Sequence, residues 1–204
     1  MKTRGPAYQD ARACTLRLMP LRSLISEQQI RERIAEMGAA IDRDYPEGIL
    51  YLICILKGAT IFHADLARAI KRDAFLDFMG ISSYGLEKST SGQVQVTKDL
   101  DISIEGAHVL IVEDIVDSGV TLTYLTRVLA QRNPKSLAIA ALLDKPDRRL
   151  RPVDVKYVGF KIPDEFVVGY GLDYAQRYRN LRDVCVLEDA DTPATTSDAS
   201  IQLT

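Results

Sequence analysis

The chain has 204 residues, a length typical of one domain with a sizeable hydrophobic core. Its hydrophobic content of 47% and charged content of 26% are ordinary for a globular protein, and its formal net charge of -2 gives no overall attraction to nucleic acid or acidic membranes. The three cysteines, Cys14, Cys54 and Cys185, are far apart, which argues against a disulfide framework or a structural zinc site. Cys54 and Cys185 lie within apolar runs, so we expect buried thiols there.

No signal peptide or membrane span is expected. Lys2 and Arg4 near the N-terminus are not followed by an apolar segment. The longest apolar stretches, residues 49–56 and 137–143, are too short to cross a bilayer. We therefore expect a cytoplasmic protein.

The first 22 residues show no sustained periodicity, which predicts a loose N-terminal arm. Ser26 and Gln29 then have the spacing of a capping box at a helix start. The apolar residues that follow recur on one helix face and predict a helix ending near residues 44–46. They are Ile30, Ile34, Met37 and Ile41.

A buried strand is expected over residues 49–56, ending at Lys57-Gly58, and a second helix over 61–70. Taken alone, Lys57 is most simply a surface lysine at a strand end. The alternative is that Lys57 contacts an anion bound at the carboxyl ends of the strands, because the strand that begins at residue 109 also ends in charged residues.

Residues 75–81 alternate imperfectly and predict a strand. A polar stretch over 86–95 follows Ser83 and Tyr84, and it is either a functional lid or a disordered loop. Residues 100–104 predict a further short strand.

Residues 109–122 hold the most informative pattern in the chain. Four apolar residues predict a strand buried on both faces, and an apolar face beginning at Leu122 predicts a helix. The turn between them contains Gly119. In an open α/β sheet such a turn lies where ligands bind, and its amides with the helix N-terminus form an anion site.

Three carboxylates in this stretch, Glu113, Asp114 and Asp117, would repel a phosphate if they faced it. We therefore expect them to face hydroxyls, a metal or a proton to be moved, so that the site suits a sugar phosphate. The structural alternative is that Asp117 caps the helix and that the other two are solvated. That alternative explains one carboxylate better than all three.

The remaining chain predicts a strand over 137–143 ending at Asp144-Lys145, an edge strand over 153–160 and a closing strand over 184–187. Between the last two lies a turn-rich segment, whose aromatic residues are either core or able to stack on a planar ligand. These are Phe166, Tyr170 and Tyr174.

Strands alternating with helices predict an α/β fold with a mostly parallel central sheet flanked by helices, and a small subdomain beside it. The expected boundaries are an arm over 1–22, one domain over 23–188 and a disordered tail over 189–204, which is rich in Asp, Thr, Ser and Ala.

Residues 109–122 resemble the phosphoribosyl-pyrophosphate-binding motif of the type I phosphoribosyltransferases. Residues 55–58, 143–146 and 162–179 extend the resemblance, which covers about residues 23–187. The segment Phe166–Asp173 resembles the 6-oxopurine branch, the hypoxanthine–guanine phosphoribosyltransferases in their bacterial form. The resemblance implies a purine salvage reaction. In it the 5-phosphoribosyl group passes from phosphoribosyl pyrophosphate to hypoxanthine or guanine, giving IMP or GMP and pyrophosphate, with Mg²⁺ as cofactor.

The resemblance also implies roles for single residues. Glu113 and Asp114 would hold the ribose hydroxyls, and Asp117 would be the general acid/base on the purine. The 5′-phosphate would lie against the amides of the turn, which belong to Asp117, Ser118, Gly119, Val120 and Thr121. Ser118 stands where some members have Thr, which keeps the hydroxyl.

The purine would be bound by Lys145, Phe166, Val167 and Asp173, the pyrophosphate by Lys57, Gly58 and Arg179, and Mg²⁺ by Asp173 with Glu113 and Asp114. Ser83 and Tyr84 would belong to a mobile loop that excludes water. A homodimer or homotetramer is implied as well.

Three rival functions remain at this point. Another enzyme of the superfamily would act on adenine, which Lys145 and the segment Phe166–Asp173 argue against, or on xanthine, which stays open as a secondary substrate. A nucleotide-responsive RNA-binding regulator should show a basic face with interleaved aromatics, and no Lys/Arg cluster is present. A catalytically inactive nucleotide-binding domain is disfavoured by the full set of matching residues.

Overall fold

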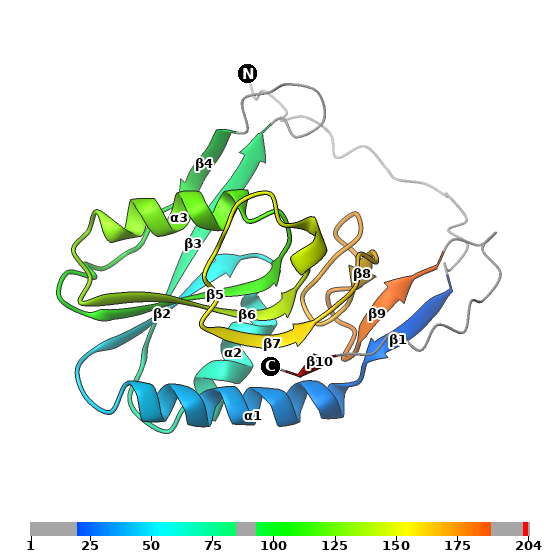
Figure 1. Ribbon diagram of the computed structural model, residues 1–204, viewed down its shortest axis with the longest axis horizontal. Coiled ribbons are helices and arrows are strands. Elements are labelled where there is room, and N and C mark those ends of the chain that lie inside the picture. The colour runs from blue at the N-terminus through cyan, green and yellow to red at the C-terminus, as the bar shows by residue number, and fades with distance from the viewer. Residues whose placement is uncertain (1–19, 85–92, 189–201, 204) are drawn as a thin grey trace, which may run out of the picture.

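A computed structural model of the chain describes residues 20–84, 93–188 and 202–203. Its elements in chain order are β1 (Leu21–Ile25), α1 (Glu27–Asp44), β2 (Leu50–Leu56), α2 (Thr60–Ala69), β3 (Phe75–Tyr84), β4 (Gln93–Lys98), β5 (His108–Val116), α3 (Val120–Ala130), β6 (Ser136–Asp144), the 3₁₀ turn η1 (Pro146–Arg148), β7 (Tyr157–Lys161), β8 (Val167–Val168), β9 (Val184–Leu187) and β10 (Gln202–Leu203) (Figure 1).

The central sheet has seven strands in the order β10-β7-β6-β5-β2-β3-β4. Strands β3, β2, β5, β6 and β7 run parallel, and β4 and β10 pair antiparallel at the two edges. A second, antiparallel sheet of order β1-β9-β8 lies beyond the carboxyl ends of the parallel strands (Figure 1). This confirms the predicted α/β fold with a small subdomain.

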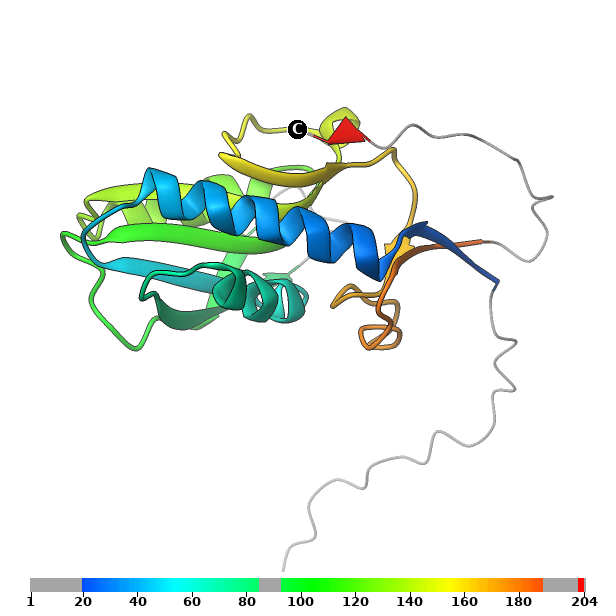
Figure 2. The same ribbon diagram turned by 90° about the horizontal axis from the view of Figure 1, so that it is seen from below.

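Helices cover both faces of the central sheet, α1 and α2 on one face and α3 on the other (Figures 1 and 2). Because side chains alternate along a strand, β5 contributes to both cores. Leu110 and Val112 pack in the core under α1 and α2, while Val109 and Ile111 pack in the core under α3. The apolar runs of β2, β5 and β6 are therefore explained by burial on both faces.

The predicted first helix is confirmed. The Ser26 side chain accepts from the Gln29 backbone N–H at 3.3 Å, and the Gln29 side chain accepts from the Ser26 N–H at 2.9 Å, so both halves of the capping box form. The helix ends at Asp44, as expected. Cys54 and Cys185 are buried free thiols, also as expected, whereas Cys14 lies outside the described residues.

Four boundaries differ from the sequence-based expectations at strand ends or edges. Strand β5 continues through the carboxylates to Val116, and β1 includes the last two residues of the predicted arm. The predicted strand over 153–160 begins only at Tyr157, and it is not an edge, because β10 pairs with it. Residues 202–203 of the predicted disordered tail thus form a strand, and residues 189–201 lie outside the described part.

The predicted short strand over residues 100–104 is wrong. The amide of Leu100 donates to its neighbour's carboxylate, Asp99 Oδ1, at 2.8 Å, and the amide of Asp101 donates to Asp77 Oδ2 at 2.9 Å. These side-chain acceptors take the place of a partner strand, so the segment connects β4 to β5 without joining the sheet.

Candidate active site

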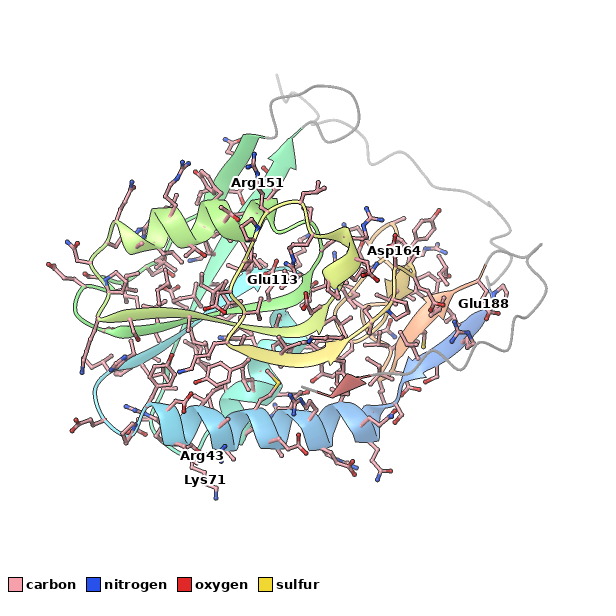
Figure 3. The ribbon with its side chains drawn as sticks, viewed as in Figure 1. Arg43, Lys71, Glu113, Arg151, Asp164 and Glu188 are labelled. Atoms are coloured by element: carbon pink, nitrogen blue, oxygen red, sulfur yellow. The ribbon has the colours of Figure 1, made fainter. Side chains whose placement is uncertain are left out.

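The turn after β5 is shaped by Gly119, which has a φ of +79°. A Cβ at this position would come to 2.5 Å from the carbonyl oxygen of Arg151, so only glycine fits both the conformation and the space. The amides of Leu150 and Arg151 donate to the Ser118 carbonyl at 2.9 and 3.0 Å. In Figure 3, Arg151 accordingly lies beside the start of α3. The loop after η1 therefore holds the turn in place.

Two adjoining cavities lie at the carboxyl end of β5. The smaller, of about 90 Å³, is lined by the turn, with Asp117, Ser118, Gly119 and Thr121 among its walls. The other, of about 230 Å³, is lined by residues of β2, β3 and β5 and by Gly58, Asp114 and Thr121. Glu113 and Thr121 line both. Larger cavities of about 540 and 650 Å³ lie along α1, but they contain none of the residues predicted to bind the ribose or the phosphate.

Glu113 and Asp114 are held in an environment that disfavours their charge. Burial, and then the neighbouring charge of Asp114, raise the pKa of Glu113 well above its ordinary value. Burial raises the pKa of Asp114 to about 6, although the Ile115 amide donates to its Oδ1 at 2.8 Å. Glu113 Oε2 is buried without a hydrogen-bond partner among the described residues. Such carboxylates favour a ligand that brings hydroxyl donors or a cation.

This arrangement predicts a measurable dependence of stability on pH. In the folded protein Asp114 stays protonated up to a pH of about 6, whereas in the unfolded chain it ionises near its ordinary pKa of about 4. Between these values the folded state binds more protons, so the contribution of Asp114 to the free energy of unfolding falls as pH rises. We expect Asp114→Asn to gain stability relative to the unsubstituted protein between about pH 4 and pH 6. Urea unfolding across this range measures the difference.

Asp154→Asn is the control for this experiment, because Asp154 is an exposed residue of the β6–β7 connection. It should run parallel to the unsubstituted protein at each pH. A constant difference between Asp114→Asn and the unsubstituted protein over the whole range would contradict the prediction.

The loop after β2 meets the same carboxylate. A Cβ on Gly58 would overlap the Asp114 carboxylate, and a Cβ on Gly171 would overlap the Gly58 carbonyl. Arg179 Nη1 donates to the Gly171 carbonyl at 2.7 Å, and its Nη2 pairs with Asp173 Oδ1 at 2.6 Å. The structure thus brings Gly58, Asp114, Asp173 and Arg179 together from three distant parts of the chain. Gly58 and Arg179 were predicted to contact pyrophosphate, Asp114 to hold the ribose and Mg²⁺, and Asp173 to bind the purine and Mg²⁺.

A second group of predicted residues lies at the end of β6. The side chain of Lys145 is buried, and its Nζ donates to the Glu165 carbonyl at 2.6 Å. Directly after Glu165, the Phe166 ring is 54% exposed and meets Tyr174 edge-to-face at 5.7 Å. Tyr170, by contrast, is buried. Of the two alternatives for these aromatic residues, Tyr170 therefore packs in the core, whereas the Phe166 ring is accessible to a ligand.

The Val167 backbone lies at an edge of the small sheet. Leu187 donates to the Phe166 carbonyl at 3.0 Å, and Val167 stands opposite Val186. Hydrogen-bonded and non-hydrogen-bonded pairs alternate in an antiparallel ladder. The N–H and C=O of Val167 therefore point away from β9, toward the open edge.

Asp117 has a partner that the sequence did not indicate. Its Oδ1 lies 2.8 Å from Nε of Arg148, in the turn η1 that follows Lys145. The adjacent Arg149 pairs with Asp144 at the end of β6. The charged run Asp147-Arg148-Arg149 was the only available signal, and such runs are usually solvated surface.

A family model for the phosphoribosyl transferase domain matches residues 23–175. The chain belongs to this family. Hypoxanthine-guanine phosphoribosyltransferase from Mycobacterium avium is 52% identical over 171 residues, covering 81% of this chain and 84% of the relative. Hypoxanthine phosphoribosyltransferase from Escherichia coli is 52% identical over 160 residues, covering 78% and 90%.

Solved structures of the family agree with these relatives. The hypoxanthine-guanine phosphoribosyltransferase of Bacillus anthracis has a TM-score of 0.80 and 45% identity, covering 83% of this chain and 99% of its own. The expected resemblance to the 6-oxopurine branch of the phosphoribosyltransferases is therefore confirmed.

The predicted mobile loop lies mostly outside the described residues. The backbone of Ser83 and Tyr84 forms the end of β3, while their side chains and residues 85–92 lie outside the described part. Over the described ranges, no helix is long and apolar enough to cross a membrane.

A cation site for this family can be tested against the residues present. Within the described residues, no three Asp, Glu, His or Cys side chains could enclose a metal ion by themselves. The oxygens of Glu113, Asp114 and Asp173 are nevertheless ligands that Mg²⁺ prefers, and Glu113 Oε2 is an unpartnered buried acceptor. The residues fit a Mg²⁺ ion that takes its other ligands from a substrate.

Proposed function

We propose that the protein transfers the 5-phosphoribosyl group from phosphoribosyl pyrophosphate to hypoxanthine or guanine, giving IMP or GMP and pyrophosphate in purine salvage. One observation carries this most directly. Asp117 begins the glycine turn proposed to bind the 5′-phosphate, and it pairs with Arg148. Arg148 also pairs with Asp164, which lies next to Lys145 Nζ and two residues before Phe166. A phosphate site and a site for a planar base therefore lie on the two sides of one carboxylate. The names of the relatives support the same substrates.

At the ribose end, the turn amides from Asp117 to Thr121, with the hydroxyls of Ser118 and Thr121, hold the 5′-phosphate. Glu113 and Asp114 accept from the ribose hydroxyls, which supplies a donor to Glu113 Oε2, a buried oxygen without a hydrogen-bond partner among the described residues. As pyrophosphate leaves, positive charge develops on the ribose ring. The nearby carboxylates stabilise that charge in the transition state.

At the base end, a purine ring nitrogen attacks the anomeric carbon while Asp117 takes up or returns the ring proton. Lys145 donates to the 6-oxo group. Because its ammonium group is only a donor, it selects a carbonyl over the amino group of adenine. Phe166 stacks on the base, and the outward-facing backbone of Val167 reads its Watson–Crick edge. Asp173 also contributes to binding of the purine.

At the leaving-group end, Lys57, the Gly58 amide and Arg179 contact the pyrophosphate. Asp173, with Glu113 and Asp114, holds Mg²⁺, which when bound neutralises the charge of the leaving group. Arg179 already orients Asp173 through their ion pair at 2.6 Å. Ser83 and Tyr84 belong to a loop that closes over the site and excludes water, since hydrolysis of the activated ribose is the competing reaction.

We further propose that the protein works in the cytoplasm, as a homodimer or homotetramer and without a nucleic-acid partner. Size-exclusion chromatography with light scattering gives the number of subunits. An RNA-binding regulator would instead retain RNA at physiological salt.

The decisive experiment offers hypoxanthine, guanine, xanthine and adenine in turn to the purified protein with Mg²⁺ and phosphoribosyl pyrophosphate. Nucleotide formation is followed by absorbance and by chromatography. We expect IMP and GMP to form, and no AMP. If neither hypoxanthine nor guanine yields nucleotide, the proposed function is refuted.

Lys145→Gln tests the recognition of the base. A hydrogen bond to a charged group contributes roughly 1.5–3 kcal/mol, so kcat/KM for hypoxanthine should fall by roughly ten- to two-hundredfold. The KM for phosphoribosyl pyrophosphate should change little, because Lys145 lies on the base side of Asp117. Lys161→Gln is the matched control, since Lys161 lies in β7 away from both cavities at the end of β5. An equal loss in both variants would contradict the assignment of Lys145.

A further inference from the structure

Arg148 joins two carboxylates on opposite sides of the turn η1. Its Nε lies 2.8 Å from Asp117 Oδ1, and its Nη1 lies 3.2 Å from Asp164 Oδ1. A guanidinium group presents donors on different edges of one rigid plane, so a single arginine can fix two carboxylates relative to each other. A lysine has one nitrogen and cannot reproduce this fork.

Asp164 continues the chain of contacts toward the base. Its Oδ1 lies 3.7 Å from Nζ of Lys145, the same atom that donates to the Glu165 carbonyl. The backbone reinforces this arrangement, because the Arg148 amide donates to the Lys145 carbonyl at 3.2 Å. The side chains of Asp117, Arg148, Asp164 and Lys145 therefore form one continuous path. Figure 3 places Asp164 just before β8, apart from Glu113 in the central sheet.

The contact with Arg148 also distinguishes the two oxygens of Asp117. The side chain of Asp117 is 43% exposed, yet Oδ1 itself is buried, and its 2.8 Å contact with Arg148 is an ion pair without the geometry of a hydrogen bond. The exposed oxygen of the carboxylate is thus Oδ2. Arg148 pairs with the inner oxygen and leaves Oδ2 without this contact.

We propose that Arg148 is a positioning residue that holds Asp117 with Oδ2 toward the purine and fixes its distance from Lys145. The inference rests on the proposed function, because it assigns a task to Asp117 and Lys145 in that reaction. Proton transfer occurs at the imidazole ring of the purine and base recognition at the 6-oxo group of its six-membered ring, so the spacing of Asp117 and Lys145 must match the purine. The backbone already joins the two segments, because the Lys145 amide donates to the Val116 carbonyl at 2.9 Å. Arg148 adds a restraint between the side chains of Asp117 and Lys145, through its pairs with Asp117 and Asp164.

Stability is not what this network supplies. The side chains of Arg148 and Asp164 are each 51% exposed, and exposed ion pairs typically contribute little to stability. Arg148→Ala should therefore fold and melt like the unsubstituted protein. Its effect should appear in turnover, where a misplaced catalytic group costs much more.

The test compares Arg148→Ala and Arg148→Lys with Arg182→Ala. Arg182 is a matched control, because it makes an exposed ion pair of 2.8 Å with Glu27, remote from Asp117. We expect Arg148→Ala to lower kcat by roughly ten- to hundredfold with little change in KM for phosphoribosyl pyrophosphate. Arg148→Lys should recover only part of the loss, and Arg182→Ala should match the unsubstituted protein.

A double-substitution cycle separates positioning from direct contact with substrate. If Arg148 acts through Asp117, Arg148→Ala should cause no further loss of kcat in the Asp117→Asn background. Equal losses in both backgrounds, a rise in KM for phosphoribosyl pyrophosphate at constant kcat, or unchanged kcat in Arg148→Ala would each overturn the proposal. Nucleotide binding by titration calorimetry shows that each variant is folded. A protein that forms no nucleotide without any substitution refutes the proposed function itself, which is a different result.

Discussion

Asp117→Asn should lower kcat by about 10²–10⁴-fold, the range typical of a lost general acid or base. Asparagine keeps the size of the side chain but cannot accept and return a proton at neutral pH. The turn amides that we propose hold the 5′-phosphate are unchanged, so the Kd for IMP or GMP should stay within a few-fold. Steady-state kinetics and titration calorimetry measure the two quantities on the same preparation.

Asp147→Asn is the control for Asp117→Asn, because Asp147 is an exposed residue of η1 on the other side of Arg148. It should leave kcat unchanged. Lost nucleotide binding with turnover otherwise intact would refute the assigned role of Asp117. An unchanged kcat in Asp117→Asn would move the proton transfer to another group.

Gly58→Ala should abolish most of the activity, although it adds a single methyl group. The new Cβ would overlap the Asp114 carboxylate, and Gly171 limits movement of the loop on its other side. Either Asp114 leaves the ribose or the loop leaves the pyrophosphate, and displacements of about 1 Å can cost roughly a hundredfold in rate. Overpacking should also cost about 1–3 kcal/mol of stability. Measurements of kcat/KM and of urea unfolding report the two effects.

Gly106→Ala separates a local clash from a general effect of replacing glycine. Gly106 has a φ of +70°, but a Cβ there would meet no atom within 4 Å. It should lose about 1 kcal/mol of stability and keep full activity. If Gly58→Ala behaves in the same way as Gly106→Ala, the contact between Gly58 and Asp114 has no role in catalysis.

Asp117→Asn and Gly58→Ala test two features that differ in whether the sequence alone could predict them. The place of Asp117 between a buried strand and a glycine turn is a local pattern of a few neighbouring residues, and the resemblance of this stretch to the phosphoribosyl-pyrophosphate-binding motif implies the role proposed for Asp117. The contact between Gly58 and Asp114 is not a local pattern. It exists because β2 and β5 are adjacent parallel strands whose carboxyl ends reach the same edge of the sheet.

The failed predictions have the same origin. Residues 100–104 alternate between apolar and polar residues as a strand does. A strand forms only where a partner strand offers backbone groups, whereas here the Asp101 amide donates to the Asp77 side chain. Strand β7 was expected at an edge, because its own residues do not indicate that β10, from the end of the chain, pairs with it. Arg148 was not singled out in the sequence, because only the fold places Asp117 and Asp164 within reach of its guanidinium group.

The sequence by itself therefore determined the α/β class, the capped first helix and the glycine turn after the central strand, with the three carboxylates beside it. These depend on periodicity and on interactions between residues a few positions apart, which a linear chain displays directly. Only the tertiary structure decided which carboxylate oxygen is free, which glycine admits no side chain and which arginine spans the site. Those depend on distances between segments remote in the chain, and such distances exist only once the sheet has brought the strand ends together.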